Sequence, residues 1–215
     1  MDALQRILEN KLVAIIRGVK EEDVLSIAKA LSEGGITVFE ITADTPGILR
    51  LIEKVKTKLG GAVTVGAGTV LDPETARAAI MAGAEFIFSP TVSIDTILMT
   101  KRYGAVSIPG AMTPTEILSA YEQGADVIKV FPADTMGPRY MKDIHGPLPH
   151  IPLMPTGGVN LGNVKEYLNN GAVALGLGGA LVKAGEEVSE ATLEQLRQRA
   201  RQFVGEVDAY ENHRL

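Results

Sequence analysis

The feature of the sequence that most constrains its fold is a regular alternation of short apolar runs and longer stretches with helical periodicity. Residues 12–16 form a continuous apolar run, as expected for a strand that is buried on both faces. Residues 21–33 then carry apolar side chains at helical spacing, and Gly34–Gly35 ends that stretch. The same pattern recurs until eight strand–helix units are complete. The expected strands are residues 12–16, 36–42, 62–66, 85–88, 105–108, 125–132, 152–154 and 172–177.

This alternation predicts a single α/β domain. Strands that alternate with helices form βαβ units and a parallel sheet. Eight units in 215 residues fit a (β/α)₈ TIM barrel at the small end of its size range, preceded by a short N-terminal helix at residues 2–10. The domain is expected to span residues 1–208, with a polar C-terminal tail at 209–215. A doubly wound open sheet is the alternative, but no G-x-G-x-x-G motif follows the first strand.

The composition argues against several classes of function. The net charge is −5 and no basic block occurs, which argues against a nucleic-acid partner or an anionic membrane surface. The chain has no cysteine, so disulfides and thiolate metal sites are excluded. It shows no signal-peptide pattern and no apolar run long enough to span a bilayer, and the cytoplasm is the expected location.

Three charged residues lie in or directly after apolar strands: Arg17, Glu40 and Lys129. In a barrel all three would lie near the carboxyl ends of the strands, where barrel active sites form. Burial disfavours the ammonium form of a lysine, so the Lys129 amine is expected to attack a ketone and form an imine. A buried carboxyl such as Glu40 has a raised pKa and can exchange protons near neutral pH. Arg17 can bind a substrate carboxylate through its planar guanidinium, although an ion network that only stabilises packing is the alternative for all three.

Smaller polar groups accompany these charges. Thr69 and Thr156 stand at strand ends and can form hydroxyl hydrogen bonds to a ligand. Glycine-rich turns at residues 156–158 and 176–179 follow the last two strands. Barrels often bind phosphate at these two loops through backbone N–H groups. The candidate phosphate-binding residues are Gly157, Gly158, Gly178 and Gly179.

A metal site is not expected. Zinc catalysis normally requires histidines that converge on an open coordination position, whereas His145, His150 and His213 do not lie at strand ends. The first two fall in the irregular segment after the lysine strand, where a surface or capping role is expected. Neither a metal nor an organic cofactor is therefore predicted.

Six short motifs together resemble the bacterial 2-keto-3-deoxy-6-phosphogluconate (KDPG) and 4-hydroxy-2-oxoglutarate (KHG) aldolases. The motifs are EIT (40–42), GAGTV (66–70), SP (89–90), IPG (108–110), KVFPA (129–133) and PTGGV (155–159). They keep the family's order and spacing, and the resemblance extends from about residue 5 to residue 205.

The resemblance implies a cytoplasmic class I aldolase of the Entner–Doudoroff type, built as a homotrimer of (β/α)₈ barrels and acting on a small 2-keto acid. By this resemblance Lys129 forms a Schiff base with pyruvate, and Glu40 moves protons through a water molecule. Arg17 and Thr69 would hold the pyruvate carboxylate. Pro90 and Phe131 would line the pocket, and the two glycine turns would bind the substrate phosphate.

The chain departs from the family pattern at two positions. Many members carry an arginine four residues after the glutamate, where this chain has Asp44. Many also carry a serine in the last glycine turn, where this chain has Gly179. Two other functions stay open from the residues alone: another phosphate-binding barrel, such as an isomerase or synthase, and a non-catalytic trimeric scaffold.

Overall fold

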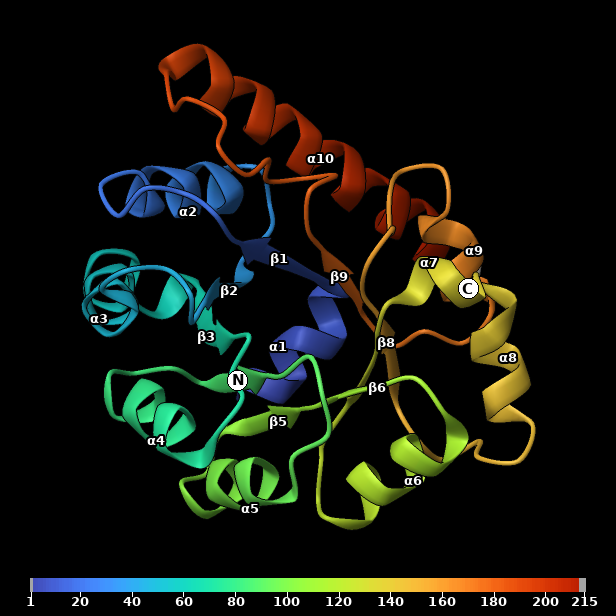
Figure 1. The fold of residues 1–215 in the computed structure, drawn as a ribbon. Helices are drawn as coiled ribbons and strands as arrows, with labels where there is room; N and C mark the ends of the chain where they lie inside the picture. The colour runs from blue at the N-terminus through green and yellow to red at the C-terminus, as the bar shows by residue number, and fades with distance from the viewer. Residues whose placement is uncertain (1, 213–215) are drawn as a thin grey trace.

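The computed structural model describes residues 2–212 and shows an α/β fold with parallel strands (Figure 1), which confirms the α/β class but not a closed barrel. The strands are β1 (Leu12–Ile16), β2 (Val38–Thr42), β3 (Thr64–Gly68), β4 (Phe86–Phe88), β5 (Val106–Ile108), β6 (Gly110–Ala111), β7 (Ile128–Val130), β8 (Leu153–Pro155) and β9 (Leu175–Leu177). The helices are α1 (Ala3–Asn10), α2 (Val24–Glu33), α3 (Ile48–Leu59), α4 (Pro73–Met81), α5 (Ile94–Arg102), α6 (Pro114–Glu122), α7 (Ala133–Met136), α8 (Arg139–His145), α9 (Val164–Asn169) and α10 (Glu190–Asn212), with a 3₁₀ turn η1 (Gly60–Ala62).

The strands form two hydrogen-bonded sheets and not the one continuous eight-stranded sheet that the sequence predicts. The order is β5-β4-β3-β2-β1-β9 in the larger sheet and β6-β7-β8 in the smaller, and every pairing is parallel. Pro109 separates β5 from β6, and Pro155 ends β8 beside β9. Proline has no N–H to donate, so each of these residues interrupts the ladder.

Limited pairing still connects the smaller sheet to β9. A single parallel bridge joins Thr156 to Gly176. In addition, the Val173 N–H donates to the Leu153 carbonyl over 2.9 Å. The carboxyl ends of β8 and β9 therefore lie side by side, which brings the two glycine turns together.

Capping residues explain where several helices begin. The Asp72 carboxylate accepts from the Thr75 N–H over 2.6 Å at the start of α4. A capping box starts α6, because Thr113 accepts from the Glu116 N–H while the Glu116 carboxylate accepts from the Thr113 N–H. These helix starts follow strands β3 and β6, so they also fix the loops at that edge of the sheets.

Several element boundaries differ from the sequence expectation. The turn η1 ends on Ala62, which was expected to begin the third strand, because the Gly60–Gly61 pair favours a turn. The short helix α7 directly follows the lysine strand and was not expected. Helix α10 continues to Asn212, beyond the expected end at residue 208, because the Tyr210 hydroxyl donates to the Leu168 carbonyl and fixes the last turns. Residues 213–215, including His213, lie outside the described residues.

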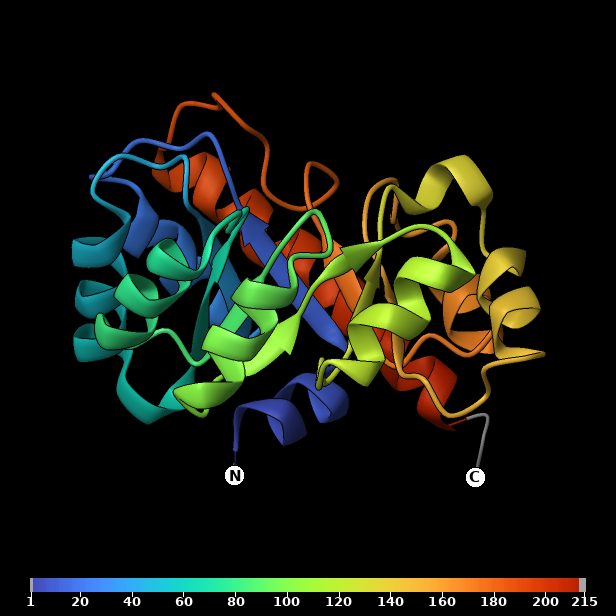
Figure 2. The ribbon, with the colours of Figure 1, turned by 60° about the horizontal axis from the view of Figure 1, so that its bottom comes forward.

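Buried apolar residues form two clusters on opposite faces of the strands. The larger cluster lies between the strands and the surrounding helices. The smaller cluster fills the inner face and contains Val13, Val38, Phe86, Phe88 and Val127, together with Ile7 of α1. Figures 1 and 2 show α1 beneath the strands, at the end opposite to the loops that follow their carboxyl ends. No helix within residues 2–212 is both long enough and apolar enough to cross a membrane.

Candidate active site

A cavity of about 600 Å³ opens among the loops that follow the carboxyl ends of the strands. It brings together every residue that the sequence analysis proposed for a site: Arg17, Glu40, Thr69, Pro90, Lys129, Phe131, Thr156, Gly157, Gly158, Gly178 and Gly179. Six further residues line it that the sequence analysis did not propose: Ile15, Val159, Asn160, Ala180, Val182 and Ala184. Most of these six are apolar or small, so their types carried no signal of chemistry.

Strand alternation directs Glu40 and Lys129 toward this cavity. Phe39 and Ile41 belong to the helix-side cluster, so Glu40 between them points to the inner face. Lys129 lies between two residues of the same helix-side cluster and also points inward. The two charged residues are 1% and 5% exposed, which is unusual unless a site uses them.

Glycine at position 68 makes room for the Glu40 carboxylate. A Cβ atom at Gly68 would lie 1.3 Å from Glu40 Oε2, so any side chain there would displace the carboxylate. Within residues 2–212, Glu40 Oε2 has no hydrogen-bond partner, and neither has the buried Thr156 Oγ1. Both atoms belong to residues that line the cavity. Unpaired buried polar atoms are costly, and a bound ligand or water would satisfy them.

Burial sets the protonation of both groups. It raises the pKa of Glu40 to about 7, against the opposing attraction of Lys129 and Arg17, and the Asp44 carboxylate raises it further. Burial also lowers the pKa of the Lys129 amine, which Glu40 raises and Arg17 lowers. Near neutral pH the site therefore contains a carboxyl that can gain or lose a proton beside an amine with an increased neutral fraction.

Arg17 and Thr69 form a polar wall of the cavity. The Arg17 Nη2 group donates to the Thr69 hydroxyl. Thr69 has a φ of 56°, a left-handed conformation that a β-branched residue rarely adopts. Such strain is typical of functional sites, where the surrounding structure holds a side chain in a required position. Arg17 itself is exposed, so its guanidinium is accessible to a ligand.

Two asparagine side chains hold the turn after β8. The amide groups of Asn160 and Asn163 each donate to the Gly158 carbonyl over 2.9 Å. In a trans peptide the next N–H points opposite to the carbonyl, so the Val159 N–H is turned away from the two amides. The sequence analysis missed this pair, because asparagines beside a turn are common and their shared acceptor is visible only in three dimensions.

Free backbone donors gather at the two glycine turns. After β9, the N–H groups of Leu181 and Val182 both donate to the Gly178 carbonyl, over 2.9 and 3.0 Å. Among the hydrogen bonds of residues 2–212, none is donated by the backbone N–H groups of Gly158, Val159, Gly179 and Ala180, which lie in the two turns and line the cavity. Such a set of donors is suited to an anion.

The described histidines lie away from the cavity. His145 shares a hydrogen bond of 3.0 Å with the Ile151 carbonyl, and His150 packs edge-on against Tyr121. Across residues 2–212 no group of three or more histidine, cysteine, aspartate or glutamate side chains is arranged to hold a metal ion.

Comparison with known proteins finds the same aldolase family that the sequence motifs resemble. A family model described as KDPG and KHG aldolase matches residues 4–197. The 2-dehydro-3-deoxy-6-phosphogalactonate aldolase of Escherichia coli (strain K12) is 33% identical over 194 residues, which cover 90% of this chain and 92% of that protein. A solved structure described as native KDPGal has a TM-score of 0.87 at 31% identity and covers 94% and 96% of the two chains. KDPG aldolase from Legionella pneumophila, solved with pyruvate captured as a covalent carbinolamine, has a TM-score of 0.79 at 27% identity and covers 98% of each chain.

Proposed function

This chain belongs to the KDPG and KHG aldolase family, and from that membership we propose that it is a class I aldolase that cleaves KDPG to pyruvate and glyceraldehyde 3-phosphate. We propose that it also cleaves KHG to pyruvate and glyoxylate. The observation that carries the proposal is the buried Lys129 amine, with its lowered pKa, in one cavity with a carboxyl that titrates near 7. A phosphate-binding isomerase or synthase would have no need for such an amine.

The proposed reaction begins when the neutral Lys129 amine adds to the C2 ketone of the substrate. Glu40 protonates the oxygen of this carbinolamine, which leaves as water and gives an iminium. Glu40, now a carboxylate, accepts the proton of the C4 hydroxyl, directly or through a water molecule. The C3–C4 bond then breaks, and its electron pair enters the iminium to give an enamine and a free aldehyde. Protonation at C3 and hydrolysis of the resulting iminium release pyruvate.

The remaining cavity residues are assigned to the two ends of the substrate. Arg17 and the hydroxyls of Thr69 and Thr156 hold the carboxylate beside the ketone, which the unpaired Thr156 Oγ1 supports. Pro90 and Phe131 line the pocket wall. The turns at Gly157–Gly158 and Gly178–Gly179 bind the phosphate through free N–H groups.

Reductive trapping tests the function directly. Incubation with pyruvate and borohydride should add one reduced pyruvate to the protein, and peptide mass spectrometry should place it on Lys129. Incubation with borohydride alone is the control. If no adduct forms while the aldol substrate is still cleaved, the imine mechanism is wrong.

Substitution of Gly179 by serine is expected to strengthen binding of phosphorylated substrates. A Cβ atom at Gly179 meets nothing within 4 Å, so a side chain is accommodated there. One added hydroxyl hydrogen bond contributes about 0.5–1.5 kcal/mol, which corresponds to a roughly 2- to 12-fold lower KM for KDPG. The KM for unphosphorylated KHG should not change, and steady-state kinetics on both substrates measures the difference.

Gly179→Ala is the matched control, because it adds the Cβ atom without the hydroxyl. Equal effects of both variants on both substrates would show that this turn does not contact the phosphate. Gly158 is a poorer position for the test, since a Cβ atom there would lie 2.2 Å from the Asp134 Cβ and would disturb the turn itself.

Chelation is expected to leave the activity unchanged. The iminium serves as the electron sink for C–C cleavage, so the reaction requires no Lewis acid. Cleavage rates before and after dialysis against EDTA should agree. Lost activity that returns with a divalent ion would contradict this mechanism.

We further propose that the strands close into one eight-stranded barrel. The separation of β5 from β6 by Pro109 alone supports counting them as one interrupted strand, and the Thr156–Gly176 bridge supports closure between β8 and β9. The barrel domain is assigned to residues 1–208, and α10 continues four residues into the segment that was expected to be a tail. The homotrimer and the cytoplasmic location stay predictions, and sedimentation of the purified protein tests the first.

A further inference from the structure

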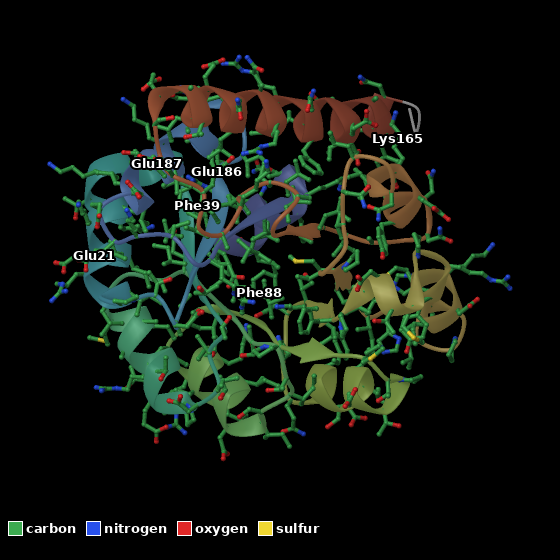
Figure 3. All side chains as sticks on the ribbon, turned by 45° about the horizontal axis from the view of Figure 1, so that its top comes forward. Glu21, Phe39, Phe88, Lys165, Glu186 and Glu187 are labelled. Atoms are coloured by element: carbon green, nitrogen blue, oxygen red, sulfur yellow. The ribbon has the colours of Figure 1, made fainter. Side chains whose placement is uncertain are left out.

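The Lys129 amine lies between two aromatic rings. Its Nζ atom is 4.7 Å from the ring centroid of Phe131 and also 4.7 Å from that of Phe88. Phe131 lines the cavity, whereas Phe88 is fully buried beneath it in the inner cluster. Figure 3 places Phe88 in the middle of the molecule, inside the ring of helices. The sequence analysis did not single out this residue, because a phenylalanine in an apolar strand is expected in any core.

The local packing holds the Phe88 ring in place. Residues 86 and 88 face inward from β4, while Ile87 between them belongs to the helix-side cluster. The Phe86 ring meets the Phe88 ring edge-on, with centroids 6.0 Å apart and planes at 80°. Phe88 is 0% exposed, so a ligand that enters the cavity does not need to displace its ring.

The charge on Lys129 has few other stabilising contacts. Within residues 2–212, its Nζ atom forms no ion pair and no hydrogen bond. Glu40 from β2 and Arg17 after β1 are the charged groups that act on the amine, and they act in opposite directions. An aromatic face carries negative charge density, so a cation over it is stabilised, most strongly where water is excluded.

We propose that Phe88 stabilises the positive charge on Lys129 Nζ, first as the ammonium of the resting protein and then as the iminium of the bound keto acid. The inference rests on the proposed function, because the iminium forms only if Lys129 is the nucleophile. The neutral amine forms the bond to C2 and gives one of its protons to the former ketone oxygen. This oxygen takes a second proton from Glu40 and leaves as water, so the iminium nitrogen gains one positive charge. Phe88 contacts this reacting nitrogen and exchanges no proton or electron itself.

This role has a pH dependence that simple packing would not produce. At low pH both the resting amine and the iminium are cations, so a weaker ring contact destabilises them equally and the affinity for pyruvate does not change. At high pH the resting amine is neutral and only the iminium is charged. A weaker ring contact should then reduce the affinity for pyruvate.

The experiment replaces Phe88 by 4-fluoro-, 3,5-difluoro- and 3,4,5-trifluorophenylalanine in the full-length protein. Each fluorine withdraws charge from the ring face while the shape is nearly kept. The apparent dissociation constant for pyruvate is measured by borohydride trapping across the pH range. At high pH it should rise stepwise with the number of fluorines, by about two- to tenfold for the trifluoro ring, and at low pH it should stay unchanged.

Fluorination of Phe86 is the matched control, because this ring is equally buried in the same cluster and, among the cation–aromatic contacts of residues 2–212, makes none with Lys129. Affinities that fall equally at all pH values, or that do not depend on fluorine number, would overturn the role of Phe88. Failure of the proposed function looks different, since then the unsubstituted protein itself would form no adduct with pyruvate.

Discussion

Replacement of Lys129 by methionine is expected to abolish aldol cleavage while the fold is retained. Methionine fills nearly the same space but has no nitrogen to form the imine. Loss of a covalent nucleophile lowers kcat by roughly 10⁵- to 10⁶-fold in well-studied enzymes, and a loss of that size is expected here. Cleavage of KDPG, followed by coupled detection of pyruvate, measures the loss.

The stability of this variant should be equal to or greater than that of the natural chain. Lys129 is 5% exposed, and its burial disfavours the charged form. Replacement by methionine therefore removes the free-energy cost of burying an ammonium group. A melting temperature that does not fall would show that lost activity reflects lost chemistry. Lys29→Met is the matched control, because Lys29 is exposed and forms a surface ion pair of 3.7 Å with Glu33. Cleavage that persists in Lys129→Met would refute the imine mechanism.

The location of the proposed reacting groups could be predicted from the sequence because of their unusual setting. A lysine and a glutamate inside apolar strands conflict with the ordinary composition of barrel interiors, so Lys129 and Glu40 stood out. Parallel strands then place their carboxyl ends at one edge, which predicted that Arg17, Thr69 and the glycine turns would meet there. The cavity contains all of them.

Other features depend on geometry that residue types do not encode. Pro109 and Pro155 directly follow two of the predicted strands, but the interruption of the hydrogen-bonded ladder becomes apparent only when neighbouring strands are placed. The strained backbone of Thr69 is likewise set by its surroundings, since threonine itself disfavours a φ of 56°. Phe88 was missed for a related reason, because its contact with Lys129 joins two strands that lie far apart in sequence.

The reason for a glycine at position 68 becomes clear only in the structure. In the sequence it is one small residue in the motif GAGTV at positions 66–70. In the structure the space of its missing side chain contains the Glu40 carboxylate. The glycine therefore helps to set the environment of Glu40, and with it the protonation of the group that the mechanism requires.

Substitution of Glu40 by glutamine is expected to lower the cleavage rate by about 10²- to 10⁴-fold, the usual contribution of one positioned proton-transfer group. Glutamine keeps the shape beside Gly68 but cannot exchange a proton with the carbinolamine or the C4 hydroxyl. Borohydride trapping with pyruvate should slow as well, because carbinolamine dehydration uses the same carboxyl. If Glu40→Gln cleaves KDPG at the natural rate across the pH range, another group transfers these protons.

The pH dependence of cleavage separates the role of Glu40 from a packing effect. The proposed reaction starts from a neutral Lys129 amine with one proton on Glu40, so the site cannot react when both groups are protonated. Burial raises the pKa of Glu40 to about 7, so kcat/KM should fall as the pH drops below about 7. Asp44 is exposed, and its carboxylate raises the pKa of Glu40. Asp44→Asn should therefore lower the pKa of Glu40 and move the low-pH fall of kcat/KM (the acid limb) to lower pH, with little change in the maximal rate. An unshifted limb in Asp44→Asn, or the same limb in Glu40→Gln, would show that the observed titration belongs to a different group.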